Sequence, residues 1–334
     1  MGVCLVSPEI FMFTESSFSP AWWLKNGHVQ TMAAKLLRRN HTLDTSDETL
    51  ELPDGDFVDL AWTEKVDASC QRPIIAVLHG LEGSKNSHYA KGMLSAIKAK
   101  GWVGVLMHFR GCSGRPNRMA KSYHSGQTCD VDFFSKHIAT NYPQAKKAIV
   151  GFSLGGNVLT RYLAEQKENI YQAASVICAP LDLSSCCDRI NQGFSRVYQK
   201  YLVDMLKDST LEKIRINLLT NIDKSKLLNI RSIRDFDQMI TAPINGFIDA
   251  NDYYHKASGR DVIGNIQAPC LIIHAADDPF LCHKNTTAIN MLPEHITFEV
   301  SDRGGHVGFI SGNNPLKPQF WLESRIPEFF SRHL

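Results

Sequence analysis

Short apolar runs alternate with stretches of helical spacing along most of the chain. The continuous runs cover residues 74–78, 102–107, 148–150, 174–179 and 270–274, and a further strand pattern covers 296–300. Between the runs, apolar positions recur every three or four residues at 89–100, 128–140 and 158–163. Continuous apolar strands are typical of a parallel sheet buried on both faces. The alternation predicts an α/β fold with a mostly parallel central sheet and helices on both faces.

Residues 49–64 predict a β-hairpin ahead of the first buried strand. Leu50 and Leu52 alternate with polar neighbours, residues 53–56 read Pro-Asp-Gly-Asp, as in a tight turn, and residues 57–62 return. We expect these two antiparallel strands to be edge strands that open the sheet.

The pattern changes at residues 181–267, where helical spacing occurs without a clear strand. We therefore expect one α/β core, formed by residues 1–180 and 268–334, with a helical cap inserted at 181–267. Apolar and aromatic side chains of the cap are candidates for lining a pocket: Phe194, Tyr198, Tyr201 and Leu202.

Residues 31–39 predict a short basic amphipathic helix. Met32, Leu36 and Leu37 would share one face, and the basic side chains lie off it: Lys35, Arg38 and Arg39. We expect the apolar face to pack on the domain; contact with a membrane surface is the alternative.

The composition is that of an ordinary globular protein and narrows the classes of function. Hydrophobic residues make up 43% and charged residues 21% of the 334 residues, and 36 basic residues nearly balance 34 acidic ones. This balance indicates no basic face, so we expect no nucleic-acid partner. No apolar stretch of signal-peptide length follows Met1, and no run of about 18 apolar residues occurs. We therefore expect a cytoplasmic protein.

The nine cysteines are odd in number and include no Cys-x-x-Cys pair, which is typical of reduced thiols. Cys186 and Cys187 are adjacent, so a metal or redox site is an alternative. No Cys or His stands at ligand spacing beside them. We expect a structural role for the cysteines, and neither a metal nor a cofactor.

A serine stands where a predicted buried strand passes directly into a predicted helix. The apolar run at 148–150 stops at Gly151, Ser153 lies on the turn, Gly155 follows, and helical spacing begins at Val158. Both glycines remove Cβ atoms that would clash where strand and helix meet. The free N–H groups and the dipole of a helix N-terminus favour a developing negative charge. This Gly-x-Ser-x-Gly context predicts a nucleophile elbow.

A candidate acid and a candidate base follow later strands. Asp278 comes after the run at 270–274, and His306 comes after 296–300. In open α/β sheets, ligands bind beyond the carboxyl ends of the strands, so we expect both side chains near Ser153. The chain order Ser, Asp, His is that of α/β-hydrolases.

Other residues compete for these roles. Asp277 directly precedes Asp278, but the residue immediately before the proline fits the hydrolase pattern better. Asp182, after an earlier strand, is a further alternative for the acid. We expect His79 to shape its loop and His274 to be buried within its strand.

The chemistry assigns a role to each candidate. His306 would remove the proton of Ser153 as the serine attacks an acyl carbon, and Asp278 would orient the imidazole. The oxyanion would be bound by the backbone N–H of Leu154 and by that of Leu81, in the loop after the run at 74–78.

A set of motifs over nearly the whole chain resembles the YheT-like family of bacterial α/β-hydrolases, which is similar to the eukaryotic ABHD esterase and lipase group. The motifs are Asn-Gly-His-Val-Gln-Thr at 26–31, His-Gly-Leu-Glu-Gly-Ser at 79–84, Phe-Arg-Gly-Cys-Ser-Gly at 109–114, Ser-Tyr-His-Ser-Gly at 122–126, Gly-Phe-Ser-Leu-Gly-Gly at 151–156, His-Ala-Ala-Asp-Asp-Pro-Phe at 274–280 and Gly-Gly-His-Val-Gly-Phe at 304–309. The resemblance implies a catalytic triad at Ser153, Asp278 and His306, and carboxylesterase or acylglycerol lipase activity.

The loops at 109–114 and 122–126 are more particular to this family than to hydrolases at large. We expect Arg110, Tyr123 and His124 to brace a long loop over the site; direct contact with the substrate is the alternative.

The main hypothesis is a cofactor-free serine esterase acting on carboxylic esters with short to medium acyl chains, through an acyl-enzyme. An acylglycerol lipase, phospholipase, thioesterase, amidase or haloperoxidase would use the same residues. From a different class, the fold could serve as a non-catalytic binding module. The expected partner is a small-molecule or lipid ester, and the oligomeric state stays open.

Overall fold

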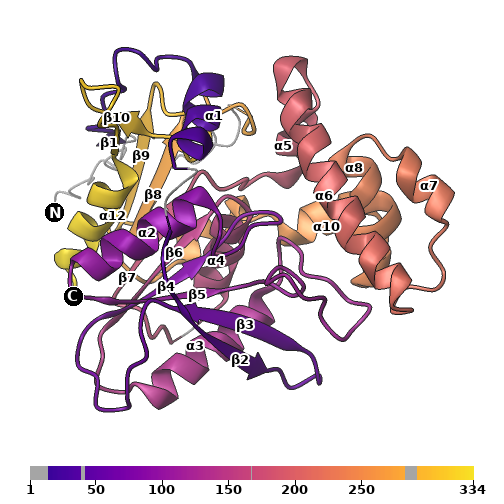
Figure 1. Cartoon of the computed structure of the whole chain (residues 1–334), viewed down its shortest axis with the longest axis horizontal. Helices are drawn as coiled ribbons and strands as arrows, with labels where there is room; N and C mark the ends of the chain where they lie inside the picture. Colours follow the sequence, from indigo (N-terminus) through magenta and orange to yellow (C-terminus); the bar gives the residue numbers. More distant parts are fainter. Residues whose placement is uncertain (1–13, 39–41, 167, 283–291) are drawn as a thin grey trace, which may run out of the picture.

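A nine-stranded sheet forms the centre of the protein. The computed structural model describes residues 14–38, 42–166, 168–282 and 292–334. The strands lie in the order β1-β9-β8-β7-β6-β4-β5-β3-β2, and neighbours are parallel except for the pairs β3–β5 and β2–β3 (Figure 1). Their bounds are Thr14–Glu15 (β1), Ser46–Glu51 (β2), Phe57–Trp62 (β3), Ile74–Leu78 (β4), Val103–Met107 (β5), Lys147–Phe152 (β6), Ala173–Ile177 (β7), Cys270–Ala275 (β8) and Ile296–Ser301 (β9). The predicted α/β fold is confirmed.

Helices cover both faces of the sheet, which explains why the central strands are apolar throughout. The covering helices are α2 (His88–Ala99), α3 (Thr128–Asn141), α4 (Leu154–Glu165) and α12 (Leu322–Ser331). Alternate residues of β4 enter different cores: Ala76 packs in the core that includes residues of α3 and α4, and Val77 packs in the core that includes residues of α2 and α12. Each strand therefore buries two apolar faces.

The edges of the sheet differ from the expectation. β2 is an edge strand, but β3 pairs with β2 on one side and β5 on the other, so the hairpin supplies one edge strand rather than two. The opposite edge is the two-residue strand β1, parallel to β9. A second small sheet pairs β10 (Ile310–Ser311) with β11 (Gln319–Phe320). Such short strands have too few residues to show alternation, so the pattern did not indicate them.

The amphipathic helix near the N-terminus begins earlier than predicted and turns a different face to the protein. α1 spans Gly27–Leu37, and the Asn26 side chain caps it by accepting hydrogen bonds from two backbone N–H groups. Its buried residues are Gly27, Gln30 and Ala34. The predicted apolar face is exposed instead: Met32, Leu36 and Leu37. The expectation that this face packs on the domain is therefore wrong, because the small residues approach the core.

Between β7 and β8 the described residues form helices. These are α5 (Leu183–Ile190), η1 (Gly193–Ser195), α6 (Arg196–Arg215), α7 (Lys224–Asn229), α8 (Ile233–Phe236), η2 (Asp237–Thr241), α9 (Ala242–Ile244), α10 (Ala250–Ala257) and η3 (Arg260–Asn265). The division of the chain into core and cap at 181 and 267 stays a prediction. None of the helices in the described ranges combines the length and the apolarity that a membrane crossing requires.

A buried carboxyl group lies among these helices. Asp237 opens η2, is almost inaccessible, and accepts a hydrogen bond from the Tyr254 hydroxyl at 2.7 Å. Burial raises the pKa of Asp237 from 3.8 to about 6. The ionised carboxylate therefore makes folding less favourable than the protonated acid does.

β6 and α4 meet at a contact that only glycine allows. A Cβ on Gly155 would overlap the His79 carbonyl oxygen and lie 2.8 Å from that of Leu78, and a Cβ on Gly151 would lie 2.5 Å from the Gly155 carbonyl oxygen. The atoms in the way belong to the backbone of the neighbouring strand and helix. No side-chain rotation can therefore make room for an added Cβ atom.

The glycine contact predicts a large effect of one methyl group. Gly155→Ala should lower the free energy of unfolding by about 3 kcal/mol, because the backbone of β4 must move away from α4. The matched control is Gly264→Ala in η3, where an added Cβ would meet nothing within 4 Å. Urea unfolding of both variants measures the difference. Equal destabilisation of the two variants would contradict a backbone collision at Gly155.

Burial of the Asp237 carboxyl predicts that its replacement by asparagine raises stability in a pH-dependent way. Below about pH 3.8 the group is protonated in both the folded and unfolded states. As the pH rises towards 6 the unfolded state ionises first, so the folded state loses stability. Asp237→Asn should therefore raise the free energy of unfolding by roughly 1–3 kcal/mol at about pH 8. The gain should shrink as the pH falls through 6.

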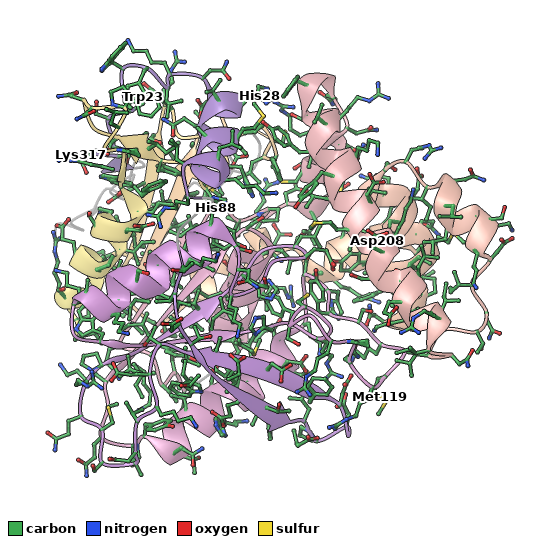
Figure 2. All side chains as sticks on the ribbon, in the orientation of Figure 1. Trp23, His28, His88, Met119, Asp208 and Lys317 are labelled. Atoms are coloured by element: carbon green, nitrogen blue, oxygen red, sulfur yellow. The ribbon has the colours of Figure 1, made fainter. Side chains whose placement is uncertain are left out.

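Chemical unfolding at several pH values measures this gain. Asp208→Asn, at the exposed position labelled in Figure 2, is the matched control and should show no such trend. A gain that stays constant with pH would show that ionisation of Asp237 is not its cause.

Candidate active site

Ser153 lies on the sharp turn between β6 and α4. Its backbone has φ +52° and ψ −122°, in a region that few residues other than glycine adopt. Its N–H donates to the Ile177 carbonyl oxygen of β7 at 2.8 Å, which fixes the turn to the sheet. The Ser153 Oγ lies 2.9 Å from the Nε2 of His306. The strained turn thus presents the hydroxyl to the imidazole, as the sequence predicted.

His306 is held from several sides. Its Nδ1 lies 2.8 Å from the Oδ2 of the buried Asp278, and its ring stacks on Phe280 with centroids 4.0 Å apart. The other oxygen of Asp278 accepts the Phe280 N–H at 2.8 Å. A carboxylate oxygen is an acceptor, so Nδ1 donates to it and Nε2 is left to accept the serine proton.

The N-terminal motif at 26–31 supports the loop that carries His306. The Thr31 hydroxyl accepts the His306 backbone N–H at 2.9 Å. Gln30 is fully buried and bonds both the N–H and the carbonyl oxygen of Ile310. Gly27 lies so close to Asp277 that a Cβ there would clash with the aspartate backbone. The motif therefore positions the histidine and aspartate loops.

The rival carboxylates have other partners. Asp277 accepts the Gly305 N–H at 2.8 Å, and burial raises its pKa. Asp182 caps the N-terminus of α5 and forms an ion pair with Arg260. The structure places Asp278 rather than either rival against His306.

The rival histidines are buried. The His79 Nδ1 donates to the Gly80 carbonyl oxygen at 2.7 Å, and its Nε2 accepts the Phe109 N–H at 3.0 Å. Burial lowers the pKa of His79 to about 3, so this side chain is a neutral brace between two loops. His274 is fully buried within β8, and burial lowers its pKa to about 4.

The loop after β4 brings Gly80, the residue before Leu81, close to the nucleophile. A Cβ on Gly80 would lie 3.0 Å from the Ser153 Cβ. The flanking N–H groups are engaged: that of Gly80 donates to the Tyr89 hydroxyl and that of Glu82 to the Tyr123 hydroxyl, both at 2.7 Å. Leu154 opens α4, so its N–H lies in a first turn that has no intrahelical acceptor. The role of these two N–H groups stays a prediction.

Glu82 ties the same loop to the helical segment, a connection that sequence reasoning missed. Its backbone has φ +51°. The Tyr123 hydroxyl donates to one carboxylate oxygen at 2.8 Å, and the Ser209 hydroxyl of α6 donates to the other at 2.6 Å. Burial raises the pKa of Glu82. The motif at 79–84 pointed to the loop, but nothing in the sequence indicated Ser209 as a partner.

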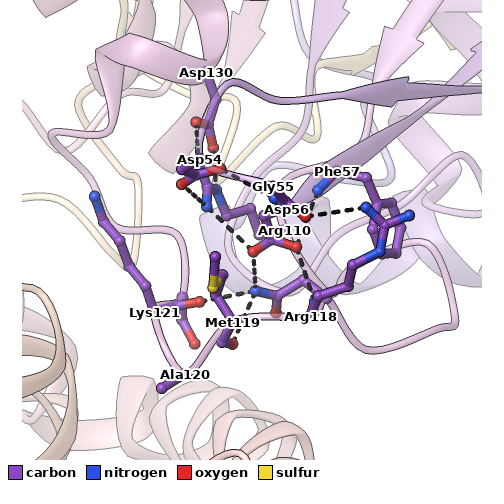
Figure 3. A network of polar contacts seen from close by, with 12 residues as sticks. Asp54, Gly55, Asp56, Phe57, Arg110, Arg118, Met119, Ala120, Lys121 and Asp130 are labelled. Atoms are coloured by element: carbon purple, nitrogen blue, oxygen red, sulfur yellow. Dashed lines mark hydrogen bonds and ion pairs between the residues drawn. The ribbon is translucent and has the colours of Figure 1, made fainter.

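Arg110 is buried and lies in an ionic network that joins three separate segments (Figure 3). It bonds both oxygens of Asp130 at 2.7 Å and reaches Asp54 at 2.7 Å and Asp56 at 3.2 Å. Burial alone would lower its pKa, but Asp130 and Asp54 raise it. Because its N–H groups donate to these carboxylates, the geometry favours the role of bracing the loop and disfavours direct contact with a substrate.

His124 also has protein partners. Its Nδ1 accepts the Gly126 N–H at 3.1 Å, its ring meets Phe247 edge to face, and burial lowers its pKa to about 4. Tyr123 holds Glu82, as described above, and stacks on Phe109. Both side chains border the cavity, so their roles towards a substrate stay predictions.

A cavity of about 1100 Å³ opens beside Ser153 and His306. Three of the four predicted cap residues line it, namely Tyr198, Tyr201 and Leu202. Phe194 is instead exposed and packs on His28 and Tyr198. Residues of α1 complete the wall, and the sequence did not indicate this.

One group of possible metal ligands occurs in the part of the chain that the structure describes. Ligand atoms of Cys178, Asp278 and His306 lie within 4.8 Å of one another. Burial raises the pKa of the Cys178 thiol, which disfavours the thiolate that binds metals. The carboxylate and the imidazole already bond each other. This arrangement suits the hydroxyl–imidazole–carboxylate chain better than a metal site.

The chain is similar to known hydrolases over most of its length. A family model described as alpha/beta hydrolase fold matches residues 73–313. Identity is 44% over 323 residues to the "Putative esterase YheT" of Escherichia coli (strain K12), covering 96% of this chain and 95% of that protein. It is 23% over 303 residues to the human "Phospholipase ABHD3", covering 89% and 74%.

A solved structure shares the fold. The Pyrococcus furiosus esterase PF2001 superposes with a TM-score of 0.56 at 17% identity, covering 88% of this chain and 92% of that one. The sequence matches and the shared architecture agree with the resemblance drawn from the motifs. The chain belongs to the YheT-like branch of the α/β-hydrolase family and is a carboxylesterase-like hydrolase.

Proposed function

We propose that this protein cleaves carboxylic esters with a Ser-His-Asp triad, through an acyl-enzyme. The observation that carries the proposal is the hydrogen-bonded chain from Ser153 through His306 to Asp278, with distances of 2.9 Å and 2.8 Å, beside a large cavity. A non-catalytic binding module would have no need of this alignment on a strained turn.

Each side chain has one task in the proposed reaction. The Ser153 oxygen attacks the acyl carbon while its proton passes to the Nε2 of His306. Asp278 stabilises the imidazolium, which then protonates the departing alcohol. A water molecule activated by the same imidazole releases the acid from the serine. The N–H groups of Leu154 and Leu81 would bind the oxyanion, each contributing about 3 kcal/mol to lowering the barrier.

The cavity bears on the length of the acyl chain. From the sequence we expect short to medium chains. The volume of about 1100 Å³ lies at the upper limit of small-molecule sites, which run to roughly 1000 Å³. The wall includes apolar side chains of the helical segment, among them Met205, Leu206 and Ile240. These observations favour a second candidate, an ester with a long acyl chain; one relative carries the name phospholipase.

An ester series tests the proposal. Purified protein should hydrolyse p-nitrophenyl esters between acetate and palmitate, and Ser153→Ala should lose at least about 10³-fold in rate. The optimum distinguishes the short-chain from the long-chain candidate. A fluorophosphonate probe on the wild-type protein is the control for an activated serine. If the protein shows no ester turnover and Ser153 is not labelled, the proposed enzymatic activity is excluded. Labelling without ester turnover would point to another acyl substrate.

A pair of neighbouring aspartates tests the role of the acid. Asp278→Asn should lower kcat by roughly 10³–10⁴-fold, because an amide favours the wrong imidazole tautomer. Asp277→Asn should lose far less, since its oxygen can still accept the Gly305 N–H. Thermal unfolding checks that both variants fold. The reverse order of activities would assign the role to Asp277.

A further inference from the structure

Exposed apolar side chains gather on α1 and on the start of α6. Trp22, just before α1, is 63% exposed, and Leu36 is 70% exposed. We call the whole set the mouth patch: Trp22, Val29, Met32, Leu36, Leu37, Phe194, Val197 and Tyr201. Soluble proteins seldom expose so many large apolar side chains together, and such patches mark interaction sites.

The two halves of the mouth patch are in contact. The His28 ring lies between α1 and the start of the helical segment, against Phe194 at 4.9 Å and Tyr198 at 5.8 Å between centroids (Figure 2). The Lys35 ammonium donates to the Tyr201 hydroxyl at 3.0 Å and lies over its ring. The patch is therefore one surface formed by two segments far apart in the sequence.

This surface borders the cavity of the candidate active site. Three residues of the mouth patch also line the cavity, namely Met32 from α1 and Val197 and Tyr201 from α6. Lys35, which bonds Tyr201, lines the cavity as well. Apolar side chains thus continue from the outside of the protein to the space beside Ser153.

The segments that carry the mouth patch are basic. Residues 16–43 contain four Lys or Arg and no Asp or Glu, and residues 189–203 contain three and none. The whole chain has a net charge of only +2, so the bias is local. Arg38 forms an ion pair with Glu323, and Lys200 forms one with Asp204. Lys25, Lys35 and Arg196 are exposed. Two copies meeting through this face would bring like charges together, which disfavours a self-association interface.

We propose that the mouth patch docks on a lipid surface that carries anionic headgroups. Apolar side chains beside exposed Lys and Arg match the two layers of such a surface: the apolar groups enter the acyl boundary and the cations meet the headgroups. Docking in this way places the mouth patch, and with it the opening of the cavity, against the lipid. The binding itself does not depend on the proposed esterase activity.

Vesicle sedimentation tests the docking. The full chain with Ser153→Ala, which leaves the lipid intact, is mixed with vesicles of phosphatidylcholine, with or without phosphatidylglycerol. It should bind the anionic vesicles, and the added change Leu36→Glu with Leu37→Glu should weaken binding by about tenfold or more. Leu228→Glu is the matched control, because Leu228 is 53% exposed on α7, far from α1 (Figure 1).

The other outcomes overturn the proposal. The proposal is wrong if the protein binds neither kind of vesicle, or if the patch variant and the control variant lose vesicle binding equally. It is also wrong if the patch variant converts a dimer to a monomer. With Ser153 present, the patch variant should hydrolyse a soluble ester at the wild-type rate. Failure of all ester hydrolysis would remove the proposed function and leave the vesicle result unaffected.

Discussion

The close approach of α4 to the ends of β4 and β6 is the constraint on which the site depends. Without side chains at Gly151 and Gly155, the helix begins against the backbone carbonyls of His79 and Leu78. This contact brings the first turn of α4, the Ser153 turn and the loop after β4 into one small volume. The loops after β8 and β9 then need only reach the same edge of the sheet for Asp278 and His306 to complete the chain of hydrogen bonds.

Long apolar runs made the fold predictable, because this signal is local. The Gly-x-Ser-x-Gly turn and the ends of two later strands pointed to the three side chains that the structure brings together, and their catalytic roles stay predictions. The signals that failed were short or distant. Two-residue strands such as β1 show no period. The partners of Arg110 come from segments up to 56 residues away, and Ser209 meets Glu82 across 127 residues. Only the folded chain shows these contacts.

The helix at 27–37 shows a different kind of failure. Its apolar residues suggested a face packed on the core, yet the core receives Gly27, Gln30 and Ala34. Close approach to Asp277 and Ile310 requires small side chains and a buried amide, so shape and hydrogen bonding decide which face is inside. Leu36 and Leu37 therefore remain exposed on the surface of the protein.

The glycine contact also bears on how such a protein can diversify. An added methyl group at Gly155 would collide with main-chain atoms, which every replacement of a neighbouring residue retains. Side-chain substitutions nearby leave these main-chain atoms in place, so the loss of stability favours glycine at this position and keeps the serine where it is. Part of the cavity wall is made of side chains from α1 and α6, which mutation can exchange one at a time. Selectivity can therefore drift while the reacting atoms stay in place.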